Sequence, residues 1–260
     1  EGYVQVQSTL PLRGFDFLAG SDDFSSMTAQ VGVQTRQLVV PRLFVDNHGG
    51  DTEIRLLNVG DTEALVQIQA RDDRSQQLGT AQVTIAPKEL FVGSARQLLG
   101  LDPTGLIDQQ AITAGKLGPF QRAATLVGVT SFIGNNGSFR STLPMIQAGQ
   151  KETLLLQVAQ SAALRMFTGI AILNCQERAA EVRVQAFSET GELTAERTVL
   201  LEPGHRLVDV RDGPSLFGLG FEQVKGHLRI VSEEPLLVFS LFGDFDYQFL
   251  SAIEGQAPIQ

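Results

Sequence analysis

Two stretches of this sequence, 116 residues apart, decide the fold. Residues 52–70 read TEIRLLNVGDTEALVQIQA, and residues 168–186 read TGIAILNCQERAAEVRVQA. The match continues without a gap, so that residues 52–92 align with residues 168–208 and 11 of the 41 positions are identical. Similarity at a fixed spacing is typical of repeated structural units. The sequence therefore predicts an internal duplication.

Both stretches alternate apolar and polar residues with a period of two. The apolar positions are Ala64, Val66, Ile68 and Ala70 in the first stretch and Ala180, Val182, Val184 and Ala186 in the second. This period is typical of antiparallel strands with one buried face. Turn signals such as Asp46-Asn47-His48-Gly49-Gly50 and Glu202-Pro203-Gly204-His205 separate the strands, as they do in β-sandwiches.

We therefore predict an all-β chain of two tandem antiparallel β-sandwich domains, Ig-like in size. Short helical turns are expected at Ser94–Leu99 and Pro214–Phe217, each after the strand that follows the Pro87 or Pro203 turn. A strand of the first repeat is expected at residues 107–114, within a partly irregular connection.

The chain begins with what reads as the end of a repeat. GYVQVQSTLPLRGFDFLAGSDDF starts at Gly2, and GHLRIVSEEPLLVFSLFGDFDYQF starts at Gly226, with Gly, Ser, Pro and Leu at shared positions. We therefore expect an extra N-terminal hairpin from a partial repeat. The predicted domains are residues 1–29 (closing strands), residues 30–147 (first sandwich) and residues 148–260 (second sandwich).

Three explanations for residues 1–29 compete. They belong to a preceding domain of a longer array, they pack with the sandwich that follows them, or they pair with an edge strand of a neighbouring subunit. A two-stranded hairpin is only marginally stable alone, so it must pack on something. The third explanation predicts assembly through Gly2, Val4, Val6, Ser8, Pro11, Leu12, Phe15 and Phe17.

Composition excludes several classes of function. The net charge is −9, and an acidic chain without a basic cluster repels nucleic-acid phosphates. No apolar run approaches the ~20 residues of a transmembrane helix, so no membrane span is predicted. Cys175 is the only cysteine, so neither an intramolecular disulfide nor a cysteine metal site is expected.

The residues of catalysis do not form a recognisable pattern. The three histidines are His48 and His205, in predicted turns, and His227, which faces outward on a predicted strand. No nucleophile elbow, zinc-protease, phosphate-loop or dinucleotide motif stands in a suitable context. We therefore predict that the chain is not an enzyme and carries no organic cofactor.

Two groups of acidic residues are candidates for calcium binding. Asp46, Asp51 and Glu53 lie around one predicted loop, and Asp244 and Asp246 around another. Calcium takes oxygen ligands from such loops, but aspartates are also common in turns because they bond to the nearby backbone. Asn58 and Asn174 likewise have two interpretations, as ligand contacts or as side chains that close a turn.

Taken together, these segments resemble a tandem Ig-like β-sandwich repeat family of secreted or surface-attached bacterial proteins. The resemblance is carried by residues 168–174 (TGIAILN), the Pro203-Gly204 turn, residues 226–232 and residues 235–243. It implies an exported protein, extracellular or on the cell surface, without known catalysis.

The expected function is a structural one. We expect a repeat subunit or segment of a surface fibre, layer or filament, which self-associates or contacts neighbouring domains of a longer chain. The alternative is a binding or adhesion module that recognises glycan or protein through its loops.

Overall fold

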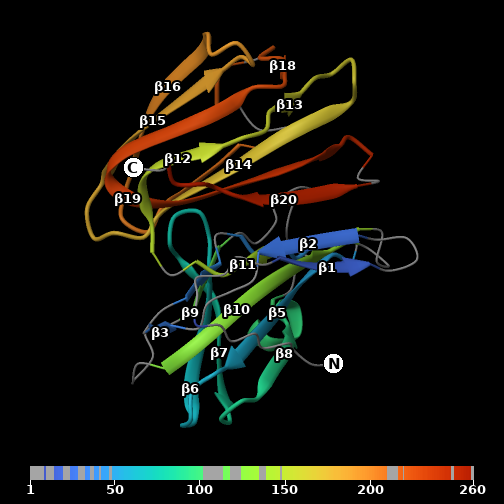
Figure 1. Ribbon diagram of the computed structural model, residues 1–260. Helices are drawn as coiled ribbons and strands as arrows, with labels where there is room; N and C mark the ends of the chain where they lie inside the picture. Colours follow the sequence, from blue (N-terminus) through green and yellow to red (C-terminus); the bar gives the residue numbers. More distant parts are fainter. Residues whose placement is uncertain are drawn as a thin grey trace. The chain divides into compact units, whose positions relative to one another are not determined.

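A computed structural model of the chain is almost entirely β (Figure 1). It describes residues 9, 15–19, 24–28, 33–35, 38–40, 42–46, 49–101, 114–117, 124–134, 139–146, 148–209, 216–218, 220–246 and 249–258. The chain divides into two compact units. Unit 1 comprises residues 1–71 and 77–147, and unit 2 comprises residues 72–76 and 148–260. The prediction of an all-β, antiparallel sandwich fold is confirmed.

Unit 1 has two antiparallel sheets that enclose one core. The first sheet has the order β11-β10-β5-β8, with β3 also paired to β10, and the second has the order β4-β9-β6-β7. The first-sheet strands are β3 (Val33–Thr35), β5 (Asp51–Asn58), β8 (Leu90–Ser94), β10 (Ala124–Ile133) and β11 (Arg140–Pro144). The second-sheet strands are β4 (Leu38–Val40), β6 (Ala64–Arg71), β7 (Gln77–Ile85) and β9 (Ala114–Leu117).

The core of unit 1 is built by the alternation seen in the sequence. Ile54 and Leu56 of β5 and the apolar face of β6 belong to one buried cluster. A short helix, α1 (Ala95–Leu99), adds Ala95 and Leu99 to this cluster. Ser94 caps the helix by accepting a hydrogen bond from the Gln97 N–H, which satisfies one of the free N–H groups of the first turn. The helical turn predicted at Ser94–Leu99 is thus confirmed.

Unit 2 is organised around one long strand, β19 (His227–Asp244). Residues 227–232 of β19 pair with β15 (Ala180–Phe187), whereas residues 236–244 pair with β14 (Met166–Asn174). Pro235 lies between the two paired segments and has no N–H to donate to a ladder. β19 therefore takes part in both layers of the sandwich.

The other strands of unit 2 attach to these three. β16 (Leu193–Leu201) pairs with β15, β17 (Arg206–Asp209) with β14, and β12 (Gln150–Leu155) and β20 (Leu250–Glu254) with β19. Two short strands, β13 (Ala159–Gln160) and β18 (Gln223–Val224), form a separate pair. Ile170 and Ile172 of β14 and the apolar face of β15 meet in one buried core.

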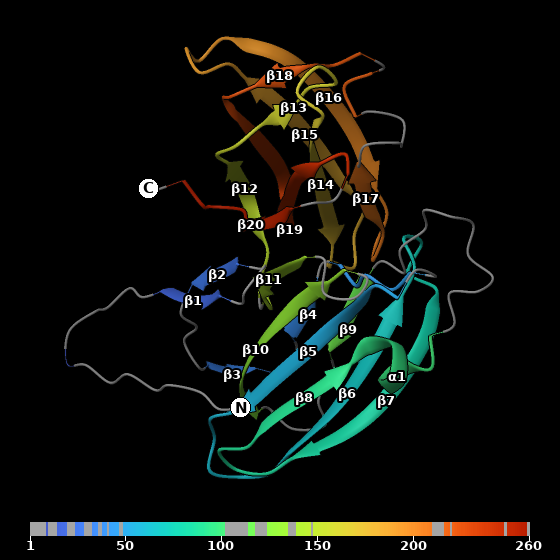
Figure 2. The ribbon, with the colours of Figure 1, turned by 90° about the vertical axis from the view of Figure 1, so that its right-hand side faces the viewer.

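The two units repeat the same local structures at the spacing seen in the sequence. β5, β6 and β7 of unit 1 correspond at an offset of 116 residues to β14, β15 and β16 of unit 2. The hairpins β6–β7 and β15–β16 even share a register shift at Ala70/Arg71 and Ala186/Phe187. Figure 2 shows β6 and β7 running side by side along their length.

The N-terminal hairpin consists of β1 (Phe15–Ala19) and β2 (Phe24–Thr28), which pair in antiparallel fashion. Phe15 lies opposite Thr28, and Phe17 lies opposite Ser26. β2 also lies near β11 of unit 1. The other predicted assembly residues, Gly2, Val4, Val6, Ser8, Pro11 and Leu12, lie outside the described residues.

Two other sequence predictions meet the described residues only in part. The strand predicted at 107–114 touches them at Ala114, where β9 begins, and residues 107–113 lie outside them. Of the helical turn predicted at Pro214–Phe217, only Leu216 and Phe217 are described, and both lie in a turn.

Candidate functional site

The carboxylates of Asp46 and Asp51 are bonded to their own loop. An Asp46 Oδ1 atom accepts the Gly50 N–H at 2.7 Å, and Asp51 Oδ1 accepts the Thr52 N–H at 2.8 Å and the Arg96 N–H at 3.1 Å. The other Asp51 oxygen bonds the Ser94 hydroxyl. These two aspartates therefore close the turn before β5 and attach it to the start of α1.

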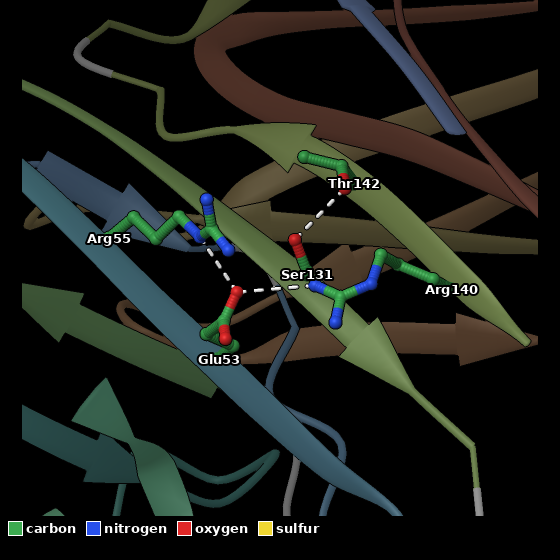
Figure 3. Close-up of polar contacts among 5 residues, drawn as sticks. All are labelled: Glu53, Arg55, Ser131, Arg140 and Thr142. Carbon is green, nitrogen blue, oxygen red and sulfur yellow. Dashed lines mark hydrogen bonds and ion pairs between the residues drawn. The ribbon is translucent and has the colours of Figure 1, made fainter. Parts of the chain in front are cut away.

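Glu53 lies on the opposite side of the first sheet from the core and contacts two arginines (Figure 3). Its Oε1 is 2.7 Å from Arg55 Nε and 3.2 Å from an Arg140 guanidinium nitrogen. Ser131 and Thr142, on the neighbouring strands, bond to each other at 2.9 Å. The side chains of this cluster link β5, β10 and β11, and the two arginines compensate the negative charge of Glu53.

The carboxylates of the second acidic loop also bond to other groups of the same chain. Asp246 binds Arg165 through two contacts, at 2.5 and 3.3 Å, and Asp244 accepts the Phe249 N–H at 3.2 Å. Within the described parts of the chain, no group of three or more His, Cys, Asp or Glu side chains is placed to hold a metal ion. Calcium binding by these loops stays a prediction, to be tested by titration with the metal.

Asn58 and Asn174 make the same set of hydrogen bonds in the two units. The Asn58 amide donates to the carbonyls of Thr62, Ile85 and Ala86, and its oxygen accepts the Gly60 N–H. The Asn174 amide donates to the carbonyls of Arg178, Leu201 and Glu202, and its oxygen accepts the Gln176 N–H. Both side chains are buried, so both close a turn and neither contacts solvent.

Asp209 is a carboxylate of unit 2 whose pKa is raised, and it too has a structural partner. Burial raises the pKa of Asp209, while its hydrogen bond from the Leu216 N–H and the charge of Arg197 act in the opposite direction. Arg197 in turn donates to the Leu216 carbonyl at 2.9 Å. Perturbed pKa values often mark active sites, but here the shifted group holds residue 216 against β16 and β17.

A further network of polar side chains lies on unit 2. Four side chains form a row across four strands, which we call the ladder: Glu152 of β12, Arg229 of β19, Gln185 of β15 and Glu196 of β16. Arg229 Nε is 2.6 Å from Glu152 Oε1, an Arg229 guanidinium nitrogen is 3.3 Å from Gln185 Oε1, and Gln185 Nε2 is 2.5 Å from Glu196 Oε2. The hydrogen bond that Arg229 donates to Glu152 raises the pKa of Arg229.

An aromatic pair flanks the ladder. Phe187 and His227 lie directly opposite each other on β15 and β19, next to the Gln185–Arg229 pair. Their rings stack with centroids 5.1 Å apart and an interplanar angle of 11°. Gly226 permits this approach, because a Cβ atom there would lie 2.1 Å from the Phe187 carbonyl oxygen. Stacked rings beside fixed donors and acceptors suit a ligand with both polar groups and a flat apolar face.

Residues of the ladder and its aromatic pair are replaced in the described part of unit 1. At the offset of 116 residues, Gln69 takes the place of Gln185 and Thr80 that of Glu196, and Lys116 pairs with Gln69 as Arg229 pairs with Gln185. The position of Phe187 is occupied by Arg71. The turn-closing asparagines are the same in both units, whereas this surface differs, so the fold does not require the ladder.

Sequence reasoning did not find the ladder. The alternation placed Gln185 and His227 on outward faces, but no pattern in the sequence singled out Glu152, Arg229 and Glu196. The signal available in the sequence was the difference between the two copies at equivalent outward positions, such as Thr80 against Glu196.

In the part of the chain that the structure describes, no helix is long and apolar enough to cross a membrane. The sequence matches no protein-family model and no curated protein.

The similar solved structures are distant ones. Thermotoga maritima 1070 has a TM-score of 0.33 and 16% identity, with 42% of this chain and 96% of that chain covered. Bacteroides uniformis beta-glucuronidase 2 has a TM-score of 0.18 and 13% identity. That alignment covers 95% of this chain but only 32% of the glucuronidase.

Proposed function

We propose that the chain is a non-enzymatic structural module, a repeat unit of an extracellular or cell-surface assembly. The observation that carries the proposal is that each unit ends one of its sheets in a nine-residue strand, β7 or β16, which among the described strands pairs on one side only. Edge strands are templates for pairing with other chains. The polar networks around Asp51, Glu53 and Asn174 support the proposal, because they are used to hold each sandwich rigid.

This function predicts that the purified chain self-associates. Analytical ultracentrifugation over a wide concentration series is expected to show a reversible shift from monomer to dimer or larger species, and electron microscopy of concentrated samples is expected to show ordered assemblies. A strictly monomeric chain across the whole series would contradict the proposal.

A second candidate function is ligand recognition by the ladder of unit 2. The observation that favours it is that unit 2 has this charged, aromatic-flanked row, whereas unit 1 has Thr80 and Arg71 at the positions of Glu196 and Phe187. The flat array of carboxylate, guanidinium and amide groups is suited to the hydroxyl groups of a glycan, and the Phe187–His227 pair to a sugar face.

The test of this second function is binding to a glycan array. Arg229→Ala is expected to reduce binding at least about tenfold, because it removes the donor that orders both Glu152 and Gln185. Arg183→Ala is the matched control, since Arg183 is an exposed arginine on the same face of β15. Equal binding by the two variants would place recognition elsewhere or exclude it.

A further inference from the structure

Among the described strands, β7 of unit 1 lies at the end of its sheet, and it carries no charge. Its nine residues read QLGTAQVTI and contain no Asp, Glu, Lys, Arg or Pro. Leu78, at one end, is 44% exposed. Natural sheets protect their edges with charges, prolines or very short strands. β7 has neither charge nor proline, and it is longer than the ~5–6 residues typical of strands. A register shift at its start leaves residues 79–85 in regular pairing with β6.

The two faces of β7 have different chemistry. Ala81 and Val83 pack against the core cluster of unit 1, and Ile85 belongs to it. Thr80, Gln82 and Thr84 alternate with them and are exposed. A strand added beside β7 would therefore extend an apolar inner layer and a polar outer layer at the same time.

Strand β7 matches itself in antiparallel orientation. When the regular part of two copies is paired about a two-fold axis through Ala81, residues 79–83 of one strand lie opposite residues 83–79 of the other, with Ala81 opposite itself. In this register Thr80 lies opposite Gln82 on the outer face. Gly79 lies opposite Val83 on the inner face. Directly opposite residues interact most strongly in a sheet, and here the pairs are polar with polar, small with apolar, and alanine with alanine.

The equivalent strand of unit 2 does not match itself. β16 reads LTAERTVLL, and its central residue is Arg197, at the position of Ala81. Full-length antiparallel pairing of two β16 strands would place Arg197 opposite Arg197, and a shift by one pair would place Glu196 opposite Glu196. Like charges directly opposite each other destabilise a sheet. The duplication has thus produced two edges, of which only β7 is free of this repulsion.

We propose that β7 is a homodimerisation edge, to which a second copy of the chain adds its own β7 in antiparallel orientation about a two-fold axis through Ala81. Such an interface is isologous and closes after two copies. The inference rests on the proposed function, and it names the partner and the strand through which unit 1 takes part in the assembly.

The test compares matched lysine substitutions in the full chain. Gln82→Lys places a charge on the outer face of β7, and Thr198→Lys places it at the equivalent position of β16, 116 residues further on. Both side chains are exposed, so both variants are expected to unfold at the wild-type temperature. Sedimentation is expected to show self-association at least about tenfold weaker in Gln82→Lys and unchanged in Thr198→Lys.

A cross-link checks the register. In a Cys175→Ser background, Ala81→Cys is expected to form a disulfide-linked dimer under mild oxidation, because opposite Cβ atoms in antiparallel strands are ~4.5–5.5 Å apart. Arg197→Cys, the equivalent position of β16, is the control and is expected to stay monomeric on a non-reducing gel.

The outcomes separate this inference from the proposed function. Self-association that survives Gln82→Lys would overturn the β7 interface and leave a structural function that uses another surface. Loss of association in Thr198→Lys alone would assign the interface to β16. A wild-type chain without any self-association would overturn the proposed function and the β7 interface together.

Discussion

Replacing Asn174 with alanine is expected to lower the free energy of unfolding of unit 2 by about 3 kcal/mol. The Asn174 amide donates to three backbone carbonyls, those of Arg178, Leu201 and Glu202, at 2.7 to 3.3 Å. Its oxygen also accepts the Gln176 N–H at 3.0 Å. Asn174 is fully buried, so water cannot replace the lost partners without opening the turn.

The measurement is urea unfolding followed by circular dichroism. Arg178→Ala is the matched control, because Asn174 bonds to the backbone carbonyl of Arg178 and the Arg178 side chain is exposed. It is expected to change the free energy of unfolding by less than about 0.5 kcal/mol. The same substitution in unit 1, Asn58→Ala, is expected to have a loss of similar size. An Asn174→Ala variant as stable as the control would show that the network contributes nothing net.

Replacing Gly226 with alanine is expected to destabilise unit 2 by a similar amount, about 3 kcal/mol. Gly226 has φ of +96°, a conformation that is costly for residues with a Cβ atom. The added Cβ would also lie 2.1 Å from the Phe187 carbonyl oxygen and 2.6 Å from Gln223 Nε2. The carbonyl belongs to the backbone of β15 and cannot move alone, so the start of β19 would have to shift.

The contribution of the close contact can be separated from that of the dihedral angle. Gly191 has φ of +84°, and a Cβ atom there would meet nothing within 4 Å. Gly191→Ala is therefore expected to lose about 1 kcal/mol from the dihedral angle alone. Hydrogen exchange should show faster opening of the amides of β15 and the first half of β19 in Gly226→Ala only. Equal losses in the two variants would show that the steric contact has no effect.

Much of the fold follows from short-range patterns in the sequence. The period-two alternation of residues 64–70 and 180–186 places strands β6 and β15 and their buried faces, because successive strand residues point to opposite sides of a sheet. The Ser94–Leu99 helical turn was also predictable, because its cap and its apolar residues are neighbours in sequence. The acidic loops were predictable as turns. The sequence did not show that Asp46 and Asp51 bond to backbone N–H groups instead of to a shared metal ion.

The ladder was not predictable because its contacts join residues 77, 44 and 11 positions apart. A shift of one residue in the pairing of β15 with β19 would turn Arg229 to the other face. That register is determined by the packing of two apolar faces and by the close approach at Gly226, which no local pattern encodes.

The antiparallel strands of this chain thus follow from its sequence, because hydrophobic periodicity and turn residues act over short distances along the chain. The sequence does not show that β19 runs through both layers, that β7 and β16 lie at the ends of their sheets among the described strands, or that the ladder forms in unit 2. The physical reason is that strand order and register depend on contacts between distant segments, which form when the apolar faces are buried together.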